Sequence, residues 1–265
     1  MRRRQLFVIV RRELAAQLVR ALWIYPVAFM PLFIVVMHAL YHRGSHYFEK
    51  ETNTLAGLFQ YYYLHVGIIL GCAGVFTRSF QTEMLDRSLH YSLLAPLRRE
   101  LLVVGKLLGG LLATASVFVG AVLACFVGTF HHFPEGRDFL WSGDGLAHLG
   151  AYGGTTALAC LGYGALFLAV GLIFKNPALP TLVILGLETW SGILPPLLQR
   201  LTVSYYLKPL CPVPAPVGGW SGVFTVVVEP TPAWLAASGL VVFTGVVVAL
   251  AGAWVRRLEI NYTTE

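Results

Sequence analysis

The chain has 265 residues, of which 57% are hydrophobic and only 12% are charged, and its mean hydropathy is +0.69. A soluble domain carries about 25% charged residues, so this composition excludes an ordinary soluble domain and points to lipid as the solvent. The net charge of +6 does not indicate a nucleic-acid-binding face, because the basic residues cluster beside apolar runs, as they do in membrane proteins. The four cysteines form no C-x-x-C pair, and we interpret them as small buried residues.

The first 20 residues predict a basic amphipathic helix over residues 2–20. Leu6, Val10, Leu14 and Leu18 recur every four residues, and arginines lie between them and at both ends. We expect this helix to lie on an anionic cytoplasmic leaflet. The first apolar run is short and is followed by charged residues, so we expect no cleavable signal peptide.

Six longer apolar runs follow, each near the ~20 residues that a helix needs to cross the hydrocarbon of a bilayer. Helices are the solution open to such runs, because every backbone polar group must be satisfied internally there. We therefore predict an all-α integral membrane protein, with one transmembrane domain over residues 1–265. The predicted spans lie near 21–41, 55–76, 107–130, 148–173, 180–198 and 235–255.

The distribution of Lys and Arg sets the orientation. If both termini are cytoplasmic, 14 of the 19 Lys and Arg residues lie inside and 5 outside, which is the asymmetry that the positive-inside rule requires. We predict a multi-pass protein with both termini in the cytoplasm. The segment 199–234 then lies outside, and because it is mostly apolar we expect it to re-enter and pack on the outer mouth of the bundle.

The stretch 77–106 separates the second and third predicted spans, on the cytoplasmic side. It predicts an amphipathic helix near 79–95, ended by Pro96, which cannot donate to the preceding turn. Arg98, Arg99 and Lys106 come before the next apolar run. One interpretation is an interfacial helix held by lipid headgroups. The apolar side of the helix carries Phe80, Met84, Leu85, Leu89 and Leu93, and the polar side carries Gln81, Asp86, Arg87 and His90.

The residue pattern of this stretch resembles the segment between the second and third spans of ABC-2 type transporter permeases. That family tends to show an acid, a Ser or Thr before Leu, a Leu-Leu pair, a Pro, an Arg and a Gly-Lys pair. Arg87 stands where the family commonly has Gly, which is one departure. The matching residues here are Glu83, Ser88-Leu89, Leu93-Leu94, Pro96, Arg99 and Gly105-Lys106.

The resemblance covers most of the chain and implies a permease subunit, with the 79–95 segment as the coupling helix that docks on a separate ATPase subunit. It also implies a second permease subunit, identical or related, and export across the plasma membrane, the inner membrane of a bacterium. ATP and Mg would bind to the partner ATPase, with no cofactor in this chain and no catalysis by it. The residues expected to couple to the ATPase are Glu83, Asp86, Arg87, His90 and Arg99.

The remaining residues leave alternatives open. No G-x-x-x-x-G-K-[ST] sequence occurs, so we expect the chain not to bind ATP by itself. Glu188 is the charged residue deep in a predicted span, and it either lines the transport path or makes a structural hydrogen bond to a neighbouring span. An ion- or proton-coupled secondary transporter that uses Glu188 is the alternative function. It would need more ionisable groups near the midplane and usually an internal repeat.

Overall fold

Every regular element of the described chain is a helix. The computed structural model describes residues 10–11, 13–14, 16–18, 21–41, 48–85, 99–174, 176–191, 194–214 and 232–257, and no strand occurs among them. In chain order the elements are η1 (Ala21–Trp23), α2 (Ile24–Tyr41), α3 (Phe48–Gly57), the π-helix η2 (Leu58–Gly67), α4 (Ile68–Leu85), α6 (Arg99–His131), α7 (Pro134–Trp141), α8 (Gly143–Ile173), α9 (Ala178–Thr189), α10 (Pro196–Gln199), α11 (Val203–Leu207), η3 (Lys208–Leu210) and α13 (Ala233–Arg257).

Five of the described helical stretches are long and apolar enough to cross a membrane. They are Ile24–Tyr41, Phe48–Thr82, Leu101–His131, Gly143–Ile173 and Ala233–Arg256. Their outward faces are apolar as well, as Phe33 on α2 and Val242 on α13 illustrate. An apolar outer surface over several long helices is typical of a multi-pass membrane protein.

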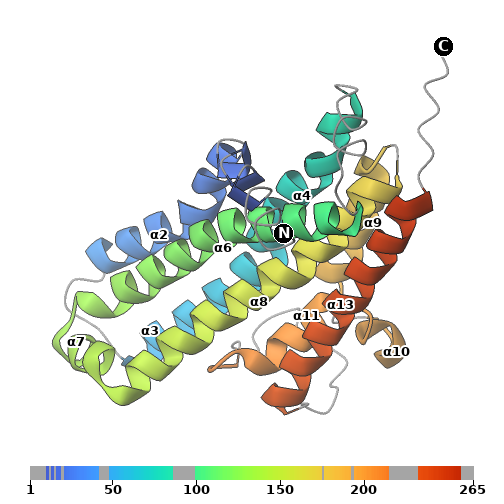
Figure 1. Ribbon diagram of the computed structural model, residues 1–265. Helices are drawn as coiled ribbons and strands as arrows, with labels where there is room; N and C mark the ends of the chain where they lie inside the picture. The colour runs from blue at the N-terminus through green and yellow to red at the C-terminus, as the bar shows by residue number, and fades with distance from the viewer. Residues whose placement is uncertain are drawn as a thin grey trace.

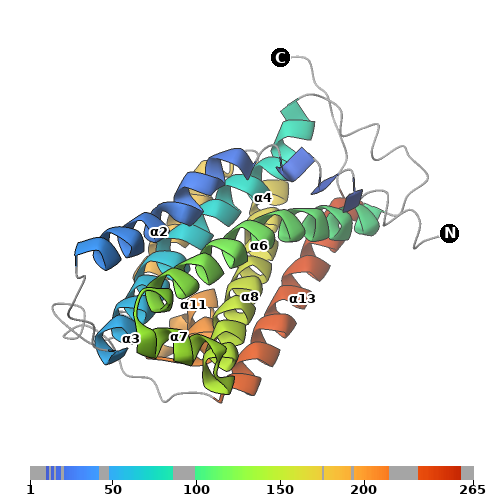
Figure 2. The ribbon, with the colours of Figure 1, turned by 90° about the vertical axis from the view of Figure 1, so that its left-hand side faces the viewer.

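Helix α8 is the centre of the bundle and packs against α4, α6 and α13 (Figure 1, Figure 2). Small residues let the neighbouring helices approach it closely. A methyl group on Gly171 would lie 2.5 Å from the backbone oxygen of Thr77 in α4, and one on Gly164 would lie 2.8 Å from the ring of Phe76. Glycine at these positions therefore sets the close contact between α4 and α8.

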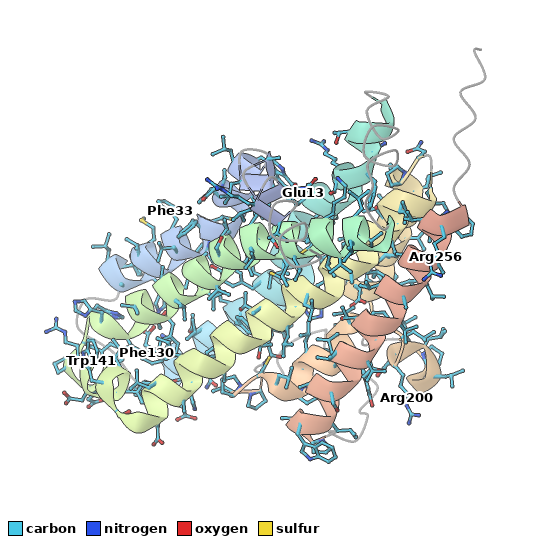
Figure 3. The ribbon with its side chains drawn as sticks, viewed as in Figure 1. Glu13, Phe33, Phe130, Trp141, Arg200 and Arg256 are labelled. Atoms are coloured by element: carbon cyan, nitrogen blue, oxygen red, sulfur yellow. The ribbon has the colours of Figure 1, made fainter. Side chains whose placement is uncertain are left out.

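Aromatic side chains are exposed toward both ends of the bundle. Tyr41 and Trp141 are exposed at the end where α6 meets α7, and Trp254 is exposed in the last turns of α13. Figure 3 shows Trp141 and Arg256 at opposite ends of the molecule. Aromatic residues at two levels are characteristic of the two water interfaces of a membrane.

The predicted spans near 21–41, 148–173 and 235–255 correspond to α2, α8 and α13. The span predicted over 55–76 is longer in the structure, because α3, η2 and α4 form one continuous helical stretch over 48–85. The span predicted over 107–130 also begins earlier, since α6 starts at Arg99. Residues 99–106, which the sequence places before this span, are therefore part of the helix, and Lys106 is buried.

The structure differs most from the prediction over 180–198. Helix α9 ends at Thr189, the chain turns at Trp190 and Ser191, and α10 begins only at Pro196. Two prolines, Pro195 and Pro196, interrupt the apolar run, because proline cannot donate the backbone bond that a continuing helix needs. With 12 residues α9 is about 18 Å long, shorter than the ~30 Å of hydrocarbon.

Candidate functional site

A buried polar cluster holds the two ends of the 86–98 connection together. Lys106 in α6 is 1% exposed, and its Nζ donates to Oε1 of Glu13 at 3.1 Å and to the backbone oxygen of Ser79 at 3.1 Å. The same nitrogen lies 5.1 Å from the ring centroid of Phe80, within the range of a cation–π interaction. One lysine therefore joins the N-terminal segment, α4 and α6.

A second bond of the cluster comes from the same part of the N-terminal segment. Gln17 Nε2 donates to the hydroxyl of Ser79 at 3.2 Å, and both residues are buried. Glu13 and Gln17 are four residues apart, and the described residues of this segment are helical, so the two side chains project from one face. Figure 3 shows Glu13 where this segment crosses α4 and α6. The predicted amphipathic helix over 2–20 thus has a buried polar side, although residues 1–9 lie outside the described chain.

Close backbone contact accompanies these bonds. A methyl group on Gly109, one turn after Lys106, would lie 2.7 Å from Cβ of Glu13 and 3.2 Å from the backbone nitrogen of Leu14. Because a real Cβ does not tolerate such a distance, the N-terminal segment fits against α6 only at a glycine. The cluster is both charge-paired and closely packed.

Most of the residues expected to couple to an ATPase lie outside the described part of the chain. Asp86, Arg87 and His90 fall in the segment 86–98, about which the structure gives nothing. Glu83 lies in the last turn of α4 and Arg99 is the first residue of α6, but their side chains are not described either. The structure therefore places the two helices that flank these residues, and the coupling role of the five residues stays a prediction.

Glu188, the expected intramembrane acid, is 3% exposed and bonded to three donors. Its Oε1 accepts from the backbone N–H of Val203 at 2.7 Å, and its Oε2 accepts from the backbone N–H of Ser204 at 3.1 Å and from the hydroxyl of Tyr163 at 3.0 Å. Val203 and Ser204 begin α11, and the side chain of its cap residue Thr202 makes no capping bond. Glu188 thus supplies the cap of α11 and fixes it to α8 and α9.

Sequence reasoning did not find the partners in either cluster. Glu13 is the one acid among the many arginines of the first 20 residues, which was a usable signal for an internal salt bridge. Tyr163 gave no signal, because a tyrosine in an apolar run is common. The transport-path role of Glu188 stays a prediction, and its contacts favour the structural alternative.

Two histidines, His38 in α2 and His132 directly after α6, lie near an acid of α3. His38 Nε2 lies 3.2 Å from Oε1 of Glu51, which joins α2 to α3. Together with His132 these two residues line a cavity of about 50 Å³. Among the residues that the structure describes, no group of three or more His, Cys, Asp or Glu is placed to hold a metal ion.

No family model matches the chain, and no curated protein matches it.

Proposed function

We propose that this chain is the membrane-spanning permease subunit of an ATP-driven transporter of the ABC-2 type. A separate ATPase subunit would bind to the predicted coupling segment near 79–95 on the cytoplasmic side and drive export through a path formed with a second permease subunit. The proposal rests on the motif between Glu83 and Lys106, whose final Lys106 is buried and bonded to Glu13 and Ser79.

The cluster around Lys106 supports the proposal because a coupling segment must be rigidly attached to the helices on both sides of it. A force on the 86–98 connection acts first on the end of α4 and the start of α6. Lys106 joins both helices to the N-terminal segment, so the three would move as one body. A two-state transporter requires such a unit, since a ligand shifts a conformational equilibrium only through contacts that differ between the states.

The course of the chain supports an even number of crossings. Helix α8 ends at the end of the bundle where α4 ends, and α13 begins at the other end (Figure 1, Figure 2). The chain between Ile173 and Ala233 must therefore pass from one end of the bundle to the other. With the five long helices this would make six crossings, and it would place the basic residues near both termini together on the cytoplasmic side.

The alternative, a secondary transporter driven by an ion or proton gradient, would depend on Glu188. Both oxygens of that carboxylate accept bonds from the chain itself. Helix α9 contains no second acid that could carry an ion or proton instead of Glu188. No specific observation therefore favours this function.

The test is to purify the chain from its native membranes in a mild detergent through a tag after Glu265. We expect an ATPase with a Walker-type phosphate-binding loop to co-purify and to hydrolyse ATP in the complex. Substitution of Glu83 and Asp86 together by Arg should release the ATPase or uncouple hydrolysis from transport, because like charges at a docked face repel.

The matched control reverses Glu135 and Asp138 to Arg, since these acids lie on α7 at the far end of the bundle. This variant should keep the ATPase bound. If the wild-type complex contains no ATPase, the proposed function is wrong. If the Glu83/Asp86 variant assembles and transports normally, those two residues are not needed for coupling.

A further inference from the structure

The chain between α8 and α13 passes through the bundle in two pieces. Helix α9 begins five residues after the end of α8 and runs back along it to Glu188. Glu188 bonds to Tyr163, which lies ten residues before Ile173, the last residue of α8. At 1.5 Å per residue this is about 15 Å from that end of the helix, near the middle of a ~30 Å hydrocarbon layer.

The second piece starts at the same depth and continues outward. Val203 and Ser204, the first residues of α11, bond to the same carboxylate as Tyr163. At the end of η3 the hydroxyl of Thr155 donates to the backbone oxygen of Leu210 at 3.2 Å. Thr155 lies eight residues before Tyr163 on α8, about 12 Å further out. Helices α9, α11 and η3 therefore make one crossing that is interrupted near the middle of the bilayer.

Arg200 lies in that interruption. It is three residues before Val203, so its Cα lies within about 10 Å of the end of α11 that Glu188 caps. The residue is exposed, and Figure 3 shows it at the edge of the molecule, pointing away from the bundle. No acidic side chain forms an ion pair with Arg200 among the described residues, and the acid of this crossing, Glu188, is buried against α8 and α11.

A guanidinium group at this depth is not stable against hydrocarbon. Ionisable residues within a membrane face water-filled cavities or partners, and they mark the paths of ions and substrates. Arg200 is the exposed charged side chain of the interruption, and the acid of this crossing, Glu188, is buried away from it. The exposed side of this crossing therefore favours negative charge.

We propose that Arg200 lines a water-filled path on the face of the subunit turned away from its own bundle, and that it binds the anionic group of the transported substrate. The inference deepens the proposed function, on which it rests, by naming the class of substrate: a molecule with a phosphate, carboxylate or other anionic head. It also places the start of the segment 199–234 inside the bilayer, where the sequence predicts an external one.

The test measures water access and electric potential beside Arg200. Leu197 is three residues earlier, on the same face of a helical turn, and is 77% exposed. We expect Leu197→Cys, in the whole chain reconstituted into vesicles, to react with charged methanethiosulfonate reagents. The negatively charged reagent should react faster than the positively charged one. Adding Arg200→Gln should slow the negatively charged reagent about five-fold, the effect of one charge at about 4 Å in water, and speed the positively charged one about five-fold, whereas Arg200→Lys should preserve the ratio of the two rates.

The matched control is Leu182→Cys on α9, where the side chain is 68% exposed on an apolar face. It should react with neither reagent, because that face contacts lipid. If Leu197→Cys is as unreactive as Leu182→Cys, no water-filled path reaches Arg200 and the inference is wrong. The inference also fails if Arg200→Gln leaves the ratio unchanged, or if Leu182→Cys reacts as readily as Leu197→Cys.

A second arm identifies the source of the anion. An uncharged maleimide is used on Leu197→Cys in phosphatidylcholine vesicles, either with inorganic phosphate added or with part of the lipid replaced by phosphatidylglycerol. Slowing by phosphate supports a soluble anion, and slowing by phosphatidylglycerol supports an anionic lipid. Slowing by neither contradicts anion binding. None of these measurements needs an ATPase, so their failure is distinguishable from failure of the proposed function.

Discussion

Glu13 and Glu188 are both buried acids, but different kinds of partner hold them. Glu13 lies against a buried ammonium group, that of Lys106, at the base of the 86–98 connection. Glu188 lies deep in the bundle and accepts bonds from two backbone N–H groups and one hydroxyl, all of them neutral. The first acid neutralises a charge and the second completes the hydrogen bonding of a helix end, so the two should respond differently to the same substitutions.

The largest expected effect comes from separating the charged pair. Glu13→Gln removes the carboxylate that accepts from the buried Lys106 ammonium group, and Lys106→Met removes the ammonium group that Glu13 bonds to. Each single substitution should lower the free energy of unfolding by about 3–5 kcal/mol, measured by titration with SDS in mixed micelles.

The double variant Glu13→Gln/Lys106→Met is the control that isolates the pairing. It removes both charges together, so it should lie closer to the wild type than either single variant does. If the two single effects simply add, the contact between Glu13 and Lys106 does not stabilise the chain through its charge.

A smaller effect is expected at Glu188, because no buried cation is left behind there. Glu188→Ala removes three bonds to a carboxylate and leaves the first N–H groups of α11 without their cap. It should cost about 2–3 kcal/mol in the same titration, and Glu188→Gln, which keeps one acceptor oxygen, should cost less.

Thr189→Ala is the neighbouring control for Glu188. Thr189 is exposed and bonds only to the backbone oxygen of Leu185 in its own helix, so its loss should change stability by about 0.5 kcal/mol or less. Equal effects at positions 188 and 189 would contradict the capping role of Glu188.

The smallest of these effects tests whether close packing around Glu13 stabilises the protein in addition to the charge of Glu13. Gly109→Ala places a methyl group against Cβ of Glu13, and overpacking of this kind costs about 1–3 kcal/mol. Gly120→Ala on the same helix is the control, since its methyl group would meet no atom within 4 Å. A shift in thermal unfolding for Gly109→Ala alone would confirm that the N-terminal segment packs directly on α6, whereas equal shifts would contradict it.

The sequence was sufficient for the parts of the fold that lipid determines. Helices α2, α8 and α13 begin and end within about five residues of the predicted spans, because a charged or polar residue next to an apolar run defines its edge. The same criterion failed for α6, since the helix continues through polar residues to Arg99. Hydropathy reports the hydrocarbon boundary, and a helix that projects beyond it is not detected.

The interrupted crossing and the Lys106 cluster needed the structure for different reasons. Leucines continue on both sides of the turn at Trp190, so the apolar signal did not reveal the break, although Pro195 and Pro196 were a warning. Glu13 and Lys106 are separated by 93 positions in the chain, and no local pattern relates residues at that distance. Long-range pairing of this kind follows from the packing of the whole bundle.

The separation between Glu13 and Lys106 also sets an order for biogenesis. A ribosome adds roughly 5–20 residues per second, so on the order of 5–20 s pass between the synthesis of Glu13 and that of Lys106. During that time its carboxylate needs water or a lipid headgroup, and the arginines beside it keep the segment at the membrane surface. Glu188 needs only 15 further residues before Val203 can bond to it. The segment that carries Glu13 is therefore made before α6 and can form its bond to Lys106 only after α6 has been synthesised, so its docking reports that the three long helices up to α6 have been inserted.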